Sequence, residues 1–103
     1  MTGYFLVRQS RGSQWDATRG RREQAGWAAH AAFIDRLSEG GRIALGGPVG
    51  DVDGEDALLV VRAGSEAEVW EMLAEDPWAD TVLRIDSVQR WTLWVGANRL
   101  PPA

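Results

Sequence analysis

Two side chains in the sequence are suited to acid/base chemistry, namely His30, which is the only histidine, and Asp76. An imidazole can gain or lose a proton near neutral pH, and a carboxylate bound to one ring nitrogen fixes which nitrogen carries the proton. Phe33, Ile34 and Leu37 follow the histidine at helical spacing, so they share one stripe of a helix with it. We therefore expect His30 on the packed side of this helix, where its ring needs a polar partner.

Asp76 is the predicted partner of His30. It stands directly before Pro77, and a proline disfavours helical backbone at the preceding residue, which places Asp76 at the C-terminal end of a second helix. The helix dipole disfavours an anion there by a few tenths to about 1 kcal/mol unless a donor compensates it. Two helices on one face of a sheet run side by side, so His30 can be this donor. The spacing alone leaves open a general acid/base pair or a hydrogen bond that merely satisfies a partly buried histidine.

A second group of residues is suited to binding a ligand. Arg19, Arg21 and Arg22 form a cluster in a long predicted loop, which is also typical of a solvated flank ahead of a helix. The planar fork of arginine suits a carboxylate, and Arg22 is the predicted contact to an anionic substrate. Trp15, an indole in the same loop, is the predicted contact to an aromatic one. Backbone around Gly46, Gly47 and Pro48 is expected to line the pocket, because glycine permits close approach, although these residues alone fit a plain turn better.

The composition excludes several other chemistries. All 11 basic residues are arginines and cysteine is absent, so the chain has no lysine for a Schiff base and no thiol nucleophile. A single histidine and the lack of metal-binding spacings argue against a metal site, and no cofactor is expected. The net charge of -4 argues against a general nucleic-acid binder. No apolar run approaches the roughly 18 residues of a membrane span and no signal peptide is evident, so a cytoplasmic protein is expected.

The pattern of apolar residues and turns predicts one α+β domain over residues 1–103. Strands are expected at residues 4–8, 42–48, 56–62 and about 81–95, the second running into a turn at Gly46-Gly47-Pro48 and the last with a bend near residues 86–87. A first helix is expected from residue 22 or 23 to Gly40-Gly41, and a second after the capping-box pair Ser65 and Glu68. This order is that of the ferredoxin-like fold, in which two helices cover one face of a four-stranded antiparallel sheet. The other face would carry exposed Leu, Val and Trp side chains, which predicts a homodimer packed face to face.

Several of these segments together resemble the YCII-related domain family over nearly the whole chain. They are the histidine helix at 27–37, Gly40-Gly41-Arg42 with Gly46-Gly47-Pro48, the apolar strand at 57–61, and Ala74-Glu75-Asp76-Pro77-Trp78. The loop with Trp15-Asp16 and residues 21–27 resembles one branch of the family. The resemblance implies a dimeric α/β barrel whose active site holds a histidine and an aspartate, which fall on His30 and Asp76. A few relatives act on lactone-type intermediates of aromatic degradation by eliminating chloride.

The leading hypothesis is a small-molecule enzyme without a cofactor, in which His30, oriented by Asp76, is the general acid/base for proton abstraction, elimination or isomerisation. One alternative is a ligand-binding or accessory module that uses the same dimer pocket without chemistry. In another, the two residues simply pin two helices together. The loop arginines favour an anionic ligand, but no motif defines the substrate.

Overall fold

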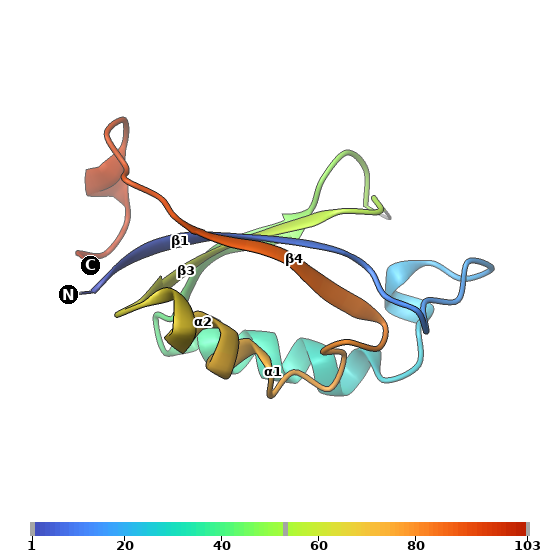
Figure 1. The fold of residues 1–103 in the computed structure, drawn as a ribbon. Coiled ribbons are helices and arrows are strands. Elements are labelled where there is room, and N and C mark those ends of the chain that lie inside the picture. The colour runs from blue at the N-terminus through green and yellow to red at the C-terminus, as the bar shows by residue number, and fades with distance from the viewer. Residues whose placement is uncertain (1, 53, 103) are drawn as a thin grey trace.

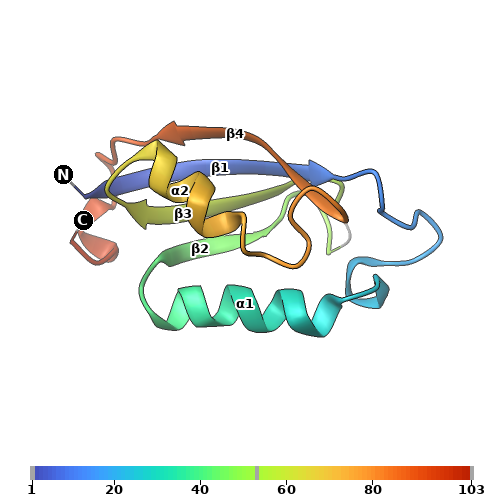
Figure 2. The ribbon, with the colours of Figure 1, turned by 60° about the horizontal axis from the view of Figure 1, so that its bottom comes forward.

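The computed structural model describes residues 2–52 and 54–102, which form a four-stranded sheet with two helices on one face (Figures 1 and 2). The elements in chain order are β1 (Gly3–Arg11), η1 (Arg21–Glu23), α1 (Trp27–Glu39), β2 (Ile43–Pro48), β3 (Ala57–Ala63), α2 (Glu66–Leu73), β4 (Leu83–Arg90) and η2 (Ala97–Arg99). The strand order is β2-β3-β1-β4, and each neighbouring pair is antiparallel. This is the predicted ferredoxin-like α+β arrangement.

The first helix begins later than the sequence pattern predicted. Residues 21–23 form a separate 3-10 turn, and α1 begins at Trp27. Between them Gly26 has a φ of 79°, a left-handed conformation that only glycine adopts readily, and its carbonyl accepts the first helical hydrogen bond from the His30 N–H. The predicted start near Arg22 is therefore wrong, because Gly26 does not lie inside the helix but is the residue at which it starts.

The start of the second helix is as predicted. The Ser65 side chain accepts a hydrogen bond from the Glu68 N–H and so caps α2. The Glu68 carboxylate accepts from the Gly64 N–H, one residue before the usual capping-box position. Arg42 Nη2 lies 2.6 Å from the same carboxylate, which ties the start of α2 to the residue before β2.

The strands differ from the predictions at their ends. Gly46, Gly47 and Pro48 continue β2 and pair with β3, so the plain turn expected there is wrong. Pairing with a neighbouring strand holds these glycines extended, which sequence pattern alone cannot detect. The last strand ends at Arg90, so its predicted extension to Val95 is also wrong, whereas the predicted irregularity exists: Arg8 pairs with Ser87 and Gln9 with Ile85, which leaves Asp86 as a bulge.

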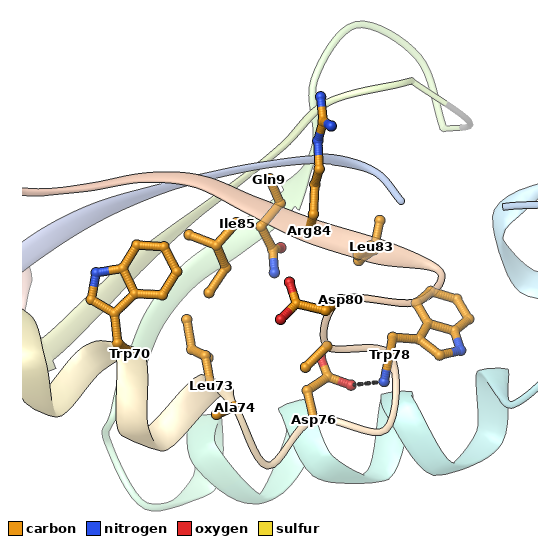
Figure 3. Close-up of a pocket in the computed structure, with 11 residues that line it drawn as sticks. Gln9, Trp70, Leu73, Ala74, Asp76, Trp78, Asp80, Leu83, Arg84 and Ile85 are labelled. Carbon is orange, nitrogen blue, oxygen red and sulfur yellow. Dashed lines mark hydrogen bonds between the residues drawn. The ribbon is translucent and has the colours of Figure 1, made fainter. Parts of the chain in front are cut away.

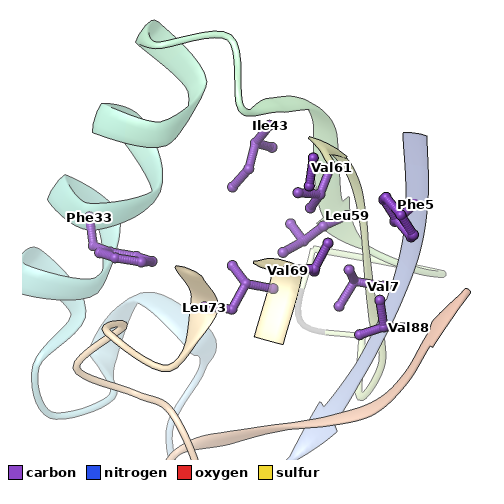
Figure 4. Packing of buried hydrophobic residues seen from close by; sticks show 10 residues of the cluster. Phe5, Val7, Phe33, Ile43, Leu59, Val61, Val69, Leu73 and Val88 are labelled. Carbon is purple, nitrogen blue, oxygen red and sulfur yellow. The ribbon is translucent and has the colours of Figure 1, made fainter. Parts of the chain in front are cut away.

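The hydrophobic core lies between the sheet and the helices (Figure 4). Alternate residues of the central strands point into it, including Phe5 and Val7 of β1, and α1 and α2 contribute Phe33 and Leu73. The unbroken apolar run of β3 is buried along most of its length. A smaller cluster of Trp78, Val82 and Leu83 packs with Trp15 and Trp27 beside the ends of both helices.

The other face of the sheet is only partly covered. By alternation it carries Leu6, Leu58 and Val60, together with Leu45, which pairs with Val60 and is 60% exposed. The segment after β4 lies on this side of the sheet (Figure 1), where the Tyr4 hydroxyl donates to the Pro101 carbonyl. Within the described residues, no helix has the length and apolar character to cross a membrane.

Candidate active site

The structure brings His30 and Asp76 together although 46 positions separate them in the chain. His30 Nδ1 lies 2.9 Å from each carboxylate oxygen of Asp76, and both side chains are buried. An ionised carboxylate only accepts hydrogen bonds, so this contact places a proton on Nδ1, and in the neutral form of the ring Nε2 then keeps its lone pair. Among the described residues, none is a hydrogen-bond partner of Nε2, so this nitrogen is available to a ligand.

The turn that follows α2 holds the carboxylate in place. Asp76 Oδ1 accepts a hydrogen bond of 2.9 Å from the Trp78 N–H, and the Asp76 carbonyl accepts from the Ala79 N–H. Figure 3 shows this turn, with the Asp76 carboxylate directed at the Trp78 backbone. The position of the carboxylate is thus fixed by hydrogen bonds within its own turn as well as by its contact with the histidine.

Aromatic rings hold the imidazole. Trp78 stacks on His30 with the ring planes 8° apart and the centroids at 4.1 Å, and Trp27 lies 5.7 Å from both rings. The indole N–H of Trp78 donates to the Ala25 carbonyl at 2.8 Å, which fixes the stacking ring. A Cβ on Gly26 would lie 3.2 Å from the Trp78 indole nitrogen, so the glycine also gives this ring its space. Imidazole orientation is set by packing as well as by the carboxylate.

His30 lines a cavity of about 580 Å³ between α1 and the sheet. Such a volume is within the usual range for small-molecule sites. Most of the wall is apolar, and its polar or charged side chains are few. The lining residues are Gln9, Arg21, Trp27, His30, Ala31, Ile34, Asp35, Ser38, Ile43, Ala44, Leu45, Gly46, Gly47, Pro48, Ala57, Leu59 and Leu83.

The predicted glycine-proline segment lies in this wall, together with His30. A Cβ on Gly46 would come within 2.5 Å of Leu59 Cδ2, so a side chain there would displace the neighbouring strand's residue. Arg22 is exposed and Trp15 packs in the small aromatic cluster, and neither is part of the lining in the described chain. Their roles in substrate binding stay predictions that no contact in this cavity supports.

Four polar residues of the wall were not predicted as site residues, namely Asp35 and Ser38 of α1 together with Arg21 and Gln9. Arg21 is buried, donates from Nη2 to the Gly54 carbonyl at 2.9 Å, and has its guanidinium 5.3 Å from the Trp15 ring. The clustered arginines pointed to this neighbourhood but could not distinguish Arg21 from Arg22. Gln9 is a polar residue that continues the inward alternation of Phe5 and Val7, which was the available signal for it.

The loop before α1 is built around one buried side chain, Gln24. Its Oε1 accepts from the Asp16 N–H, and its Nε2 lies within hydrogen-bond distance of the carbonyls of Asp16, Arg19 and Gly20. The Thr18 hydroxyl, followed by the Thr18 N–H and Arg19, lowers the pKa of Asp16 below its usual range. Hydrogen bonds within this loop therefore fix its conformation, and the loop leads directly into the 3-10 turn that places Arg21 beside the cavity.

The site could move a proton between a bound molecule and Nε2. Loss of a proton from carbon to Nε2 would create an imidazolium next to the Asp76 carboxylate, which stabilises it. The residues that the structure describes include no group of three His, Asp or Glu side chains placed to hold a metal ion.

Fold and site together define a small α+β domain with a buried histidine–carboxylate pair at a ligand-sized cavity. The YCII-related domain model matches residues 2–92, and the chain belongs to this family. No curated protein matches it. Its fold is similar to that of 5-chloro-2-hydroxyhydroquinone dehydrochlorinase from Burkholderia phenoliruptrix AC1100, solved in complex with 2,5-dihydroxybenzoquinone. That likeness has a TM-score of 0.60 at 24% identity, and it covers 89% of this chain and 94% of the other.

Proposed function

We propose that the chain is a small-molecule enzyme that uses His30 as a general acid/base, with Asp76 as its positioning residue and without a cofactor. The observation that carries the proposal is that the imidazole has a different surrounding on each side. Nδ1 lies 2.9 Å from both Asp76 oxygens, and His30 also lines the cavity. A histidine with a purely structural role has no need for a ligand-sized space beside it. Arg21 in the wall supports an anionic or readily ionised ligand.

Elimination is the reaction that we favour, with isomerisation as the other outcome of the same first step. Nε2 takes a proton from an enolic hydroxyl group or from a carbon next to a carbonyl group of the substrate, and the electron pair that the proton leaves behind shifts to form a new double bond. The leaving group, on a carbon conjugated with this double bond, departs with its bonding pair. In 5-chloro-2-hydroxyhydroquinone the ring first takes its keto form, with a proton on the carbon that bears the chlorine, and a hydroxyl proton is the one removed as chloride leaves. Isomerisation instead returns the proton to another carbon. The name of the structural neighbour, a dehydrochlorinase, supports elimination as the reaction to test first.

The experiment measures chloride release from 5-chloro-2-hydroxyhydroquinone under anaerobic conditions. We expect His30→Gln to lower kcat/KM by about 10²–10⁴-fold, the usual contribution of a general acid/base. Asp76→Asn should lower kcat more than it raises KM, because it disturbs the imidazole and not the cavity wall. Glu71→Gln, on the exposed face of α2, is the matched control and should keep wild-type turnover.

Equal turnover by wild type and His30→Gln would overturn this mechanism. Binding of the compound without turnover by the wild-type chain would instead favour the non-catalytic ligand-binding module. Because both variants replace buried groups, their unfolding curves are to be recorded alongside, so that a loss of activity is not mistaken for a loss of fold.

We also propose that two copies pack through the open face of the sheet. Leu45, which is exposed, and the half-buried Leu6 and Leu58 support the proposal, because apolar side chains open to solvent on a sheet favour burial against a partner. Light scattering after size exclusion should give twice the chain mass of 11.3 kDa. Leu58→Arg should shift the protein towards the single-chain mass, whereas a wild-type monomer would contradict the proposal.

A further inference from the structure

Gln9 stands out on the inner face of β1. The preceding inward residues of this strand, Phe5 and Val7, are in the hydrophobic core, and Gln9 follows them at the same spacing. Only 6% of Gln9 is exposed. Burying an amide on an apolar face costs free energy unless the amide forms hydrogen bonds.

Within the part of the chain that the structure describes, the Gln9 amide has no such bonds. Among the described residues, none donates to or accepts from its side chain, and its polar atoms are not sealed off from the surrounding space. Gln9 lines the cavity of His30 and also a smaller hollow of about 60 Å³ that Asp76 lines. In Figure 3 the amide points from the sheet into this smaller hollow, on the side where Asp80 lies. A buried amide without a protein partner thus faces the space around the acid/base pair.

The bulge in β4 lies directly opposite this residue. The pairing of β1 with β4 shifts between Arg8 and Gln9, because Asp86 is the extra residue on the partner strand. Bulges change the direction of nearby side chains and are frequent beside functional sites. The irregularity therefore falls at the position where the strand stops contributing core residues and contributes an amide.

We propose that Gln9 binds the substrate and positions it for His30, an inference that rests on the proposed function. Its amide offers both a donor and an acceptor, so it suits a molecule with a carbonyl and a hydroxyl group close together. The apolar remainder of the wall, with Trp27, Ile34 and Leu59, suits a flat or compact hydrocarbon body. The substrate class is thus a small hydroxylated carbonyl compound, held with an oxygen on Gln9 and an acidic C–H bond at Nε2.

The stability of a Gln9→Leu variant distinguishes a role of Gln9 in ligand binding from a role in the fold. If Gln9 served the fold, its replacement by leucine would destabilise the protein. If it serves a ligand, Gln9→Leu replaces an unpartnered buried amide by an apolar side chain of similar size, and the urea midpoint should rise. Gln14→Leu, at an exposed position of the loop after β1, is the matched control and should leave the midpoint nearly unchanged.

Binding can be followed at His30 itself. Since the chain has one histidine, its imidazole gives a single assignable set of proton NMR signals. We expect 2,5-dihydroxybenzoquinone to shift these signals in the wild type and in Gln14→Leu. Its Kd should weaken about tenfold in Gln9→Leu, as expected for the loss of one or two hydrogen bonds. The analogue 2,5-dimethoxybenzoquinone has neither the hydroxyl groups nor the negative charge that they carry once ionised, and it should bind the wild type more weakly.

Three results would overturn the inference: no shift of the His30 signals in the wild type, equal Kd values for wild type and Gln9→Leu, or a lowered urea midpoint in Gln9→Leu. Gln9→Glu keeps the size of the side chain but loses the N–H donors, and its Kd should also weaken. The proposed function fails separately, through unchanged turnover in His30→Gln. Weakened binding in Gln9→Leu with full turnover in His30→Gln would refute the mechanism and leave Gln9 as a ligand contact.

Discussion

Two buried glutamines of similar exposure, Gln24 at 4% and Gln9 at 6%, differ in what their amides contact. Gln24 accepts from one backbone N–H and reaches three carbonyls of the loop before α1 at 2.8 to 3.3 Å. The Gln9 side chain forms no hydrogen bond with the described residues, and it lines both the cavity of His30 and the smaller hollow beside Asp76. A buried amide that is hydrogen-bonded within the protein indicates a structural role. A buried amide beside a cavity that has no hydrogen-bond partner in the described chain indicates a role in binding a ligand. Burial alone does not distinguish the two.

The largest effect in this comparison is expected for Gln24→Leu. The change removes the acceptor for the Asp16 N–H and leaves loop carbonyls without their donor, so the free energy of unfolding should fall by about 2–3 kcal/mol. The measurement is urea unfolding followed by tryptophan fluorescence, with Gln14→Leu as the control. The expected loss of stability in Gln24→Leu is opposite in sign to the gain expected for Gln9→Leu. A fall below about 0.5 kcal/mol would mean that the loop does not depend on this amide.

The contact between His30 and Asp76 could be predicted from the sequence because the reason that each residue needs a partner is local. A lone histidine on an apolar helix face requires a partner, and a carboxylate before a proline at a helix end requires a donor. His30 and Asp76 satisfy each other's requirement, and the ferredoxin-like order brings the two helices to the same side of the sheet. The pairing at 2.9 Å follows from these elements.

The parts that the sequence did not predict depend on contacts between distant segments. Gly46 and Gly47 have low intrinsic strand preference, and only pairing with β3 holds them extended. The start of α1 depends on space beside Trp78, a residue more than 50 positions away in the chain. Arg21 rather than Arg22 reaches the cavity because the short 3-10 turn sets which arginine points inward. Single-residue propensities contain none of this information.

The smallest effect is expected from Asp16 in the loop that Gln24 organises. The Thr18 hydroxyl, with the Thr18 N–H and Arg19, lowers the pKa of this exposed carboxyl in the folded state below its ordinary value of 3.8. A lowered folded pKa means that the carboxylate stabilises the fold above the unfolded pKa, and that this contribution is lost as the pH falls through the folded value. Asp16→Asn should therefore be slightly less stable than the wild type at pH 7, and the difference should shrink below pH 4.

Thr18→Val removes the hydroxyl that contributes most to this shift and tests its cause. In this variant the Asp16 carboxyl, followed by NMR, should titrate closer to its ordinary pKa, while the His30 signals stay as in the wild type. A titration identical to that of the wild type would assign the lowered pKa to the Thr18 N–H and Arg19 instead. An accompanying change at His30 would show that the loop framework and the candidate site are coupled, and the two glutamines would then no longer belong to independent regions.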